Sequence, residues 1–206
     1  MKKELFRYLS NQTSDVHVIN RIIVSSYLYS NNILQVNNRL INSLIIRPSD
    51  NEYSVLVKLR SKFLIFTIEN VIEAFEFVIS PEDRIVSGAV YTPNSIRQFI
   101  IGQVFEGLEN KNDITVCDPA CGCSGFLLTA MERLKKNTNK SFKAIIEQNI
   151  YGVDIKDYAV ERSKILLTLF AISCGEDDEE IAYNFYTENS LSINWRDRLK
   201  GIDGFD

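Results

Sequence analysis

Apolar positions recur at helical spacing in the first part of the chain and give way to short apolar runs in the second part. From Val16 to Ile46 an apolar side chain returns every three or four residues, which predicts two helices or one interrupted helix. Residues 46–51 combine a proline with turn-forming residues and predict a break. A second helical region is expected from about Tyr53 to Ile79, although its middle, Phe63 to Ile68, also has the composition of a strand.

The pattern changes after residue 91. Thr92 is expected to cap a helix that has Pro93 at its first position and runs to about Glu109. The apolar stripe of this helix is formed by Ile96, Phe99, Ile100 and Val104. Short apolar runs then predict strands at 114–117, 150–153 and 184–187. Helical segments are expected between and after them, at 125–134, 142–148 and 157–173.

Strands that alternate with helices in this way are typical of a parallel sheet with helices on its faces. The predicted fold is therefore α/β, with a Rossmann-like parallel sheet preceded by a helical domain. All nine glycines lie from Gly88 onward, so we place the helical domain at residues 1–80 and the sheet-containing domain at residues 81–206.

Composition and charge narrow the class of protein. Hydrophobic residues make up 45% of the 206 residues and charged residues 24%, which excludes extended disorder. The net charge of −4 argues against a strongly basic nucleic-acid-binding module. Two small basic clusters, at residues 135–143 and 196–200, are interpreted as solvated surface. With no signal peptide and no apolar run long enough to span a membrane, we expect a cytoplasmic protein without a membrane partner.

The four cysteines are expected to be thiols in a reducing compartment. Cys117, Cys121 and Cys123 lie close together in the sequence, but they do not form paired C-x-x-C elements. The one histidine, His17, is about a hundred residues away. This set of ligands does not favour zinc, and we predict no metal site.

The segment after the first predicted strand reads Asp-Pro-Ala-Cys-Gly-Cys-Ser-Gly from Asp118 to Gly125. In an open α/β sheet, ligands bind at the carboxyl ends of the strands. Gly122 and Gly125 allow a tight turn and a close approach of the backbone. Asp118 suits a cationic group such as an amino-acid ammonium and is a poor neighbour for a pyrophosphate, and the dinucleotide fingerprint is absent. The pattern favours S-adenosylmethionine over NAD; the alternative is an ordinary strand–helix turn.

Asp154 ends the second predicted strand, where an acidic side chain can accept hydrogen bonds from both ribose hydroxyls of a nucleoside. Ile155, which follows it, is a candidate to pack on the adenine ring. The alternative role for Asp154 is to cap the next helix, and one carboxylate can do both.

These motifs together resemble the adenine-N6 DNA methyltransferases of restriction-modification systems, including type I modification subunits and fused restriction-modification enzymes. The segment 118–127 is similar to the family's D-P-A-C-G-S-G-G-F-L motif, and Gly88 to Pro93 is similar to its G-x-x-Y-T-P element. The resemblance covers about residues 80–206 and implies S-adenosylmethionine as cofactor. It implies the cofactor-binding residues Tyr91, Thr92, Pro93, Asp118, Pro119, Ala120, Gly122, Ser124, Gly125, Asp154, Ile155 and Asn189.

Two positions depart from the family's pattern. Ser124 stands where the family has a second glycine, so either the loop shifts by one residue or Ser124 takes the close-approach position. The third motif offers Asn189 where the family usually has an acidic residue, and its carbonyl oxygen can still accept a hydrogen bond from the adenine amino group.

The family's catalytic motif, N-P-P-F or N-P-P-Y, is not found among the four prolines of this sequence. Because Phe205-Asp206 resembles the start of the strand that leads into that motif, we expect an N-terminal portion of a methyltransferase without catalytic residues. DNA would then be reached through the full-length protein or a specificity subunit. The alternatives are a non-catalytic module that keeps the methyltransferase-like fold, and a methyltransferase for RNA or protein, against which the Y-T-P and D-P-A-C-G pair argues.

Overall fold

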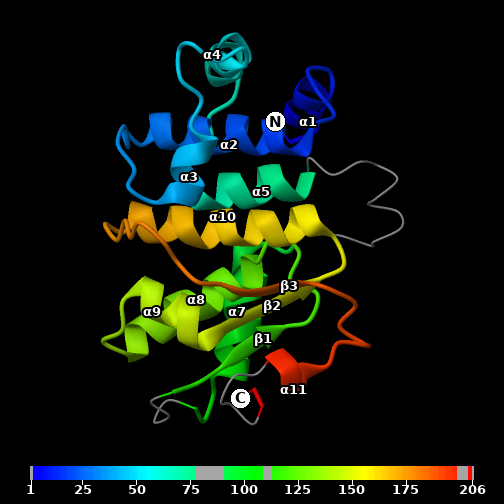
Figure 1. Cartoon of the computed structure of the whole chain (residues 1–206), viewed down its shortest axis with the longest axis vertical. Coiled ribbons are helices and arrows are strands. Elements are labelled where there is room, and N and C mark those ends of the chain that lie inside the picture. The colour runs from blue at the N-terminus through cyan, green and yellow to red at the C-terminus, as the bar shows by residue number, and fades with distance from the viewer. Residues whose placement is uncertain (1, 78–90, 109–112, 199–203, 206) are drawn as a thin grey trace. The chain divides into compact units, whose positions relative to one another are not determined.

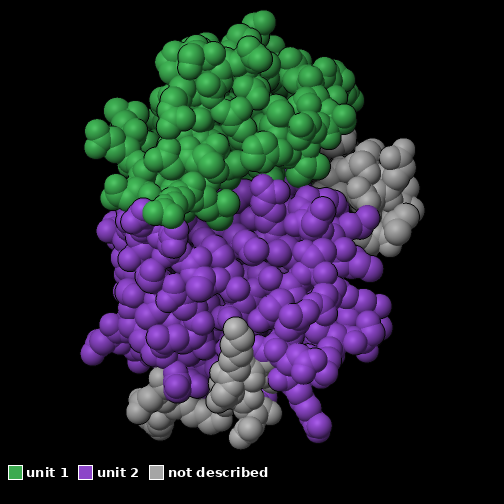
Figure 2. Space-filling view, viewed as in Figure 1, with its two compact units in different colours: residues 1–91 green, residues 92–206 purple. Residues whose placement is uncertain are grey.

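The computed structural model describes residues 2–77, 91–108, 113–198 and 204–205. Within it the chain forms two compact units, residues 1–91 and residues 92–206, which Figure 2 distinguishes by colour. The expected domain boundary, after residue 80, lies outside the described residues.

The first unit is helical over its described residues, with α1 (Lys2–Ser10), α2 (Val16–Ser30), α3 (Arg39–Leu44), α4 (Tyr53–Lys62) and α5 (Ile68–Phe77) (Figure 1). Helix α2 packs against α3, α4 and α5, and α1 packs against α5. The predicted break between two helical regions is confirmed. The segment between α4 and α5 begins with Phe63 in an extended conformation and pairs with no strand among the described residues. Helix α1 was not predicted, although its buried Leu5 and Leu9 have helical spacing.

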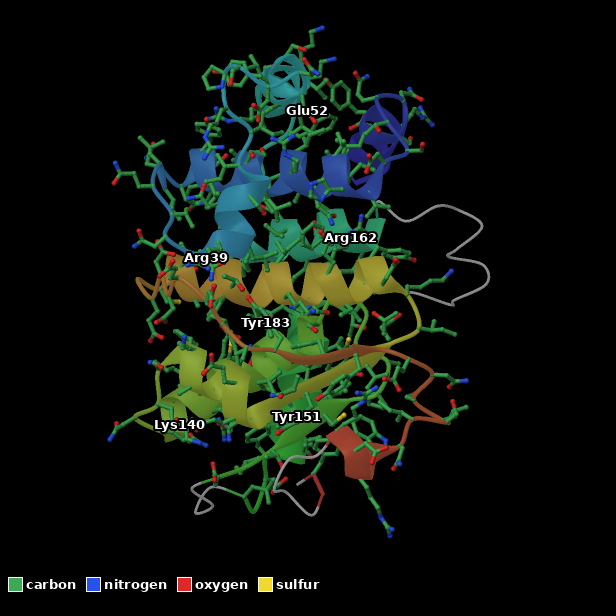
Figure 3. The ribbon with its side chains drawn as sticks, in the orientation of Figure 1. Arg39, Glu52, Lys140, Tyr151, Arg162 and Tyr183 are labelled. Atoms are coloured by element: carbon green, nitrogen blue, oxygen red, sulfur yellow. The ribbon has the colours of Figure 1, made fainter. Side chains whose placement is uncertain are left out.

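Charged residues fix the loop between α3 and α4. Arg21 of α2 forms ion pairs with Asp50 at 2.5 Å and Glu52, labelled in Figure 3, at 2.9 Å. The backbone N–H of Arg47 also donates to Asp50. That hydrogen bond and the neighbouring Arg21 guanidinium hold the pKa of Asp50 below its usual value. The ion pairs tie the loop to α2.

The second unit contains a parallel sheet in the order β1-β2-β3, formed by β1 (Val116–Asp118), β2 (Ile150–Asp154) and β3 (Asn184–Thr187). Its helices are α7 (Asn94–Val104), α8 (Gly125–Asn137), α9 (Phe142–Asn149), α10 (Asp157–Ser173) and α11 (Trp195–Arg198) (Figure 1). Helix α8 packs on β1, α9 on β2, and α10 on β2 and β3. The predicted α/β class is confirmed.

The two faces of the sheet are covered by different structures. Gly152 faces Cys121, which lies beside Ser163 of α10. Because neighbouring residues of a strand point to opposite faces, Tyr151 faces the other side. There its ring, labelled in Figure 3, meets Phe205 with centroids 5.2 Å apart. Helices therefore cover one face, and aromatic side chains from the end of the chain contact the other.

Helix α7 differs from the expectation in both of its limits, and its apolar stripe is exposed. The helix begins at Asn94 with Pro93 at the cap position, and it ends at Val104 instead of Glu109. The predicted apolar stripe of Ile96, Phe99, Ile100 and Val104 is 40–67% exposed. The buried residues of the helix are Arg97 and Ile101. Helix α7 packs against α8. Which of its side chains are buried therefore depends on this contact and not on where its apolar residues lie.

Candidate functional site

Two carboxylates end neighbouring strands at one edge of the sheet. Asp118 is the last residue of β1 and Asp154 the last of β2. Asp118 pairs in register with Gly152, so β2 continues two residues beyond β1. The carboxyl edge of the sheet therefore brings together the two acidic residues predicted to bind a ligand.

The segment 119–124, which we call the β1–α8 turn, is hydrogen-bonded to the end of β2. The N–H of Gly122 donates to Asp154 Oδ2 at 3.0 Å, and the N–H of Cys121 donates to the Val153 carbonyl at 2.9 Å. The other carboxylate oxygen, Oδ1, accepts from the N–H of Lys156 at 2.9 Å. Lys156, and not Asp154, is the cap residue of α10. Asp154 thus joins the β1–α8 turn to the end of β2.

Asp118 has a different environment. Its Oδ1 accepts one hydrogen bond, from the Ala120 N–H at 3.0 Å. Burial raises the pKa of Asp118, and the nearby charge of Asp154 raises it further. A cationic group placed beside Asp118 would offset both effects, because an opposite charge favours the ionised carboxylate.

Ser124 adopts a left-handed backbone conformation, with φ 68° and ψ 33°. Such a conformation is costly for a residue with a Cβ atom and is most readily taken by glycine. Gly122, with φ 53°, is also left-handed. The position where the family has glycine therefore keeps a glycine-like conformation here, although a serine fills it.

Gly125, the first residue of α8, lies against the buried Arg97 of α7. A Cβ atom at Gly125 would lie 3.3 Å from Cδ of Arg97. The guanidinium donates from Nη1 to the Thr92 carbonyl. Arg97 thereby connects the Thr92-Pro93 segment to the beginning of α8, a role that the sequence did not indicate because it depends on the packing of α7 against α8.

Gly152 is required by close packing. A Cβ atom there would lie 2.4 Å from Cε1 of Phe185 and 3.2 Å from Sγ of Cys121. The missing side chain lets the Phe185 ring and the Cys121 thiol pack directly over β2. This packing joins β2 to the β1–α8 turn, and it was not predicted from the sequence.

The third predicted motif, which contains Asn189, is hydrogen-bonded through its backbone to the carboxyl edge of the sheet. The N–H of Glu188 donates to the Asp154 carbonyl at 3.1 Å. The next residue, Asn189, is exposed, and its Oδ1 accepts from the Leu191 N–H at 3.0 Å. Ile155 is 67% exposed. Asn189 and Ile155 thus flank the end of β2, and the side-chain oxygen of Asn189 already stabilises a turn.

Tyr91 belongs to the first unit, where its hydroxyl donates to Oε2 of Glu69 on α5 at 3.3 Å. Thr92 and Pro93 belong to the second unit. Pro119 and Ala120 are exposed in the β1–α8 turn.

The basic cluster at residues 135–143 is largely paired with acidic side chains. Lys135 contacts Glu176 at 2.7 Å, and Lys140, labelled in Figure 3, contacts Asp113 at 2.7 Å. Lys143 lies 3.6 Å from Glu147. These contacts agree with the interpretation of the cluster as ordinary surface.

The described part of the chain contains neither a cluster of metal-binding side chains nor a membrane-spanning helix. In this part of the chain no three His, Cys, Asp or Glu side chains lie together as a metal would require. No described helix combines the length and the apolar character needed to cross a membrane. The four cysteines are free thiols.

Comparison with known proteins shows similarity to DNA methyltransferases. The chain is 33% identical over 72 residues to the methylase subunit of the type I restriction enzyme EcoEI from Escherichia coli, covering 34% of this chain and 14% of that protein. It is 32% identical over 126 residues to the type II methyltransferase M.VspI from Vibrio sp. (strain 343), covering 61% and 27%. A solved structure of the type IIL restriction-modification enzyme MmeI in complex with DNA matches 76% of this chain and 28% of that one, with 16% identity and a TM-score of 0.44.

The matches to M.VspI and the EcoEI subunit span roughly a quarter or less of those proteins. The sequence profile described as N-6 DNA Methylase matches residues 69–202, which are 134 of the 206 residues. Because this match covers well over half of the chain and includes Asp118, Asp154 and the β1–α8 turn, the chain belongs to the N-6 DNA methylase family.

Proposed function

We propose that the carboxyl edge of the sheet binds S-adenosylmethionine, and that the chain is the cofactor-binding portion of a site-specific adenine-N6 DNA methyltransferase of a restriction-modification system. The observation that carries the proposal is the placement of Asp118 and Asp154 at neighbouring strand ends, with the Gly122 N–H bonded to Asp154. The cofactor would supply the methyl group, and this chain's residues would hold it.

The two carboxylates suit different parts of the cofactor. Asp154 ends β2 and is held by two backbone N–H groups, so its oxygens have fixed directions in which to accept from ribose hydroxyls. Asp118 is half-buried and has one hydrogen-bond donor from the backbone, which favours a cationic neighbour such as the methionine ammonium. The exposed Ile155 offers an apolar surface for adenine.

In this proposal, DNA binding and the transfer of the methyl group are carried out by a longer protein of which this chain is a portion. A base must leave the duplex stack before its amino group can be methylated, and the family assigns that step to the N-P-P motif. The 206 residues do not contain that motif. We therefore propose that target recognition and catalysis depend on further protein segments or a specificity subunit.

Titration calorimetry with S-adenosylmethionine tests the proposal. Asp154→Ala should weaken binding by about 1.5–3 kcal/mol, because it removes hydrogen bonds to a charged group. Asp157→Ala is a matched control, since Asp157 is an exposed carboxylate three residues further along the chain. Equal affinity for the Asp154→Ala variant and the unmodified chain would contradict the ribose assignment.

A further inference from the structure

The two backbone polar groups of Gly122 are both held by side chains. Its N–H donates to Asp154 Oδ2 at 3.0 Å, and its carbonyl accepts from Ser163 Oγ at 2.9 Å. Ser163 lies on α10 and has no exposed surface. One residue of the β1–α8 turn is therefore bonded to the end of β2 on one side and to α10 on the other.

These two hydrogen bonds fix the conformation of Gly122. The N–H belongs to the peptide between Cys121 and Gly122, and the carbonyl belongs to the next peptide. Holding both peptide planes sets φ and ψ of a residue that would otherwise sample a wide range of conformations. The left-handed φ of 53° is thus maintained by its neighbours in the fold.

The direction of each hydrogen bond follows from the chemistry of the groups. A serine hydroxyl has one proton, which Ser163 donates to the Gly122 carbonyl. The Cys121 thiol lies 3.7 Å from Ser163 Oγ, and it donates to the same Gly122 carbonyl at 3.8 Å. Burial raises the pKa of Cys121 to about 12, so the thiol keeps its proton at neutral pH. Thiol and hydroxyl thus meet at the Gly122 carbonyl beneath the turn.

We infer that Ser163 is a positioning residue for the cofactor site: its hydroxyl holds Gly122 so that the Gly122 N–H orients the Asp154 carboxylate toward the ribose. Ser163 touches no ligand in this arrangement, because it lies beneath the turn and is fully buried. The inference rests on the proposed function, since the ribose contact belongs to that proposal. It adds a residue from α10, outside the motifs that carried the sequence analysis.

Ser163→Ala tests the inference in the full chain by titration with S-adenosylmethionine and by the amide resonance of Gly122. Affinity should fall about fivefold, as expected for the loss of one neutral hydrogen bond worth ~1 kcal/mol. The Gly122 amide proton should move upfield as its bond to Asp154 weakens. Ser163→Cys, which keeps a weaker donor, should give a smaller change in both quantities.

Thr168→Val is the matched control. Thr168 lies on the same helix, is buried, and bonds to the hydroxyl of Tyr183, labelled in Figure 3, at 2.5 Å. The control also loses a buried hydroxyl, but affinity should stay within about twofold and the Gly122 resonance should not move.

The possible results separate the inference from the proposed function. Unchanged affinity and an unmoved Gly122 resonance in Ser163→Ala would overturn the positioning role and leave cofactor binding intact. If the unmodified chain does not bind S-adenosylmethionine, the proposed function fails. The Gly122 resonance then tests the role of Ser163 without the ligand. A shift in Ser163→Ala that is absent from Thr168→Val supports the role of Ser163 in fixing the conformation of the turn. No shift overturns that role.

Discussion

The β1–α8 turn and helix α7 differ in how well the local sequence predicts their position in the fold. The turn has unusual backbone conformations at Gly122 and Ser124, and hydrogen bonds from β2 and α10 hold it in place. Helix α7 has regular geometry, but its most apolar face is exposed, while Arg97 on its other side is buried. A short motif that requires an unusual backbone conformation therefore predicts its position in the fold more reliably than the apolar stripe of a helix does.

The largest effect on the turn is expected from Gly152→Ala. The added methyl group would overlap the Phe185 ring and crowd Cys121, so we expect a loss of about 1–3 kcal/mol in the free energy of unfolding. Urea denaturation measures this loss. Gly102→Ala is the control, because nothing lies within 4 Å of a Cβ atom there. A Gly152→Ala chain as stable as the control would show that the packing between β2 and the turn is not tight.

Asp118→Asn should change stability and binding in opposite directions. The raised pKa of Asp118 means that the folded chain holds this proton more tightly than the unfolded chain, so ionisation above the usual carboxyl pKa opposes folding. The neutral amide should therefore raise the melting temperature of the ligand-free chain at pH 7 and weaken binding of S-adenosylmethionine.

The same reasoning gives the pH dependence of the unmodified chain. Affinity should fall as the pH drops through the raised pKa of Asp118, because protonation removes the charge that faces the ligand's ammonium. Calorimetric titrations between pH 4 and pH 8 measure the affinity for S-adenosylmethionine, and thermal unfolding at pH 7 measures the melting temperature of the Asp118→Asn chain. A lower melting temperature for Asp118→Asn at pH 7 would contradict the burial argument.

Ser124→Gly should stabilise the chain slightly. Glycine removes the left-handed penalty of about 1–2 kcal/mol but adds about 0.5–1 kcal/mol of backbone entropy in the unfolded state, which leaves a gain of up to ~1.5 kcal/mol. Ser141→Gly is the control, since Ser141 caps α9 with a φ of −67° and should lose stability. Thermal unfolding compares the two variants; destabilisation by Ser124→Gly would show that the Ser124 side chain contributes more than its strain costs.

The smallest effect is expected from Phe99→Ala on the exposed face of α7. Phe99 is 67% exposed, so the free energy of unfolding should change by no more than about 0.5 kcal/mol. Ile101→Ala on the same helix removes a buried side chain and should cost about 2–5 kcal/mol. Similar losses for the two variants would mean that the predicted stripe is covered after all.

Sequence reasoning located the elements of the second unit well. The limits of β3 and α10 agree with the structure, because short apolar runs and a long periodic helix leave few alternatives. Asp118 and Asp154 were found as a pair because parallel strands place their carboxyl ends at one edge.

The contacts between distant segments were not predictable in the same way. Ser163 and Arg97 show no local signal, since each contacts a residue of another element, Gly122 and Gly125 respectively. Gly152 lies in the strand predicted at residues 150–153, but its packing against Phe185 depends on the alignment of β2 with β3. Such roles depend on which elements become neighbours, and the period of apolar residues along one helix does not contain that information.

Mapping backbone amide shifts during titration with S-adenosylmethionine tests the central claim most directly. The account predicts that the largest shifts fall on the β1–α8 turn, on residues 154–156 at the end of β2, on Glu188, which is bonded to that end, and on its neighbour Asn189. The amides on the exposed face of α7, including Phe99, should stay in place. Saturable shifts centred elsewhere in the chain, or no shifts at millimolar ligand, would contradict a cofactor site at the carboxyl edge of β1 and β2.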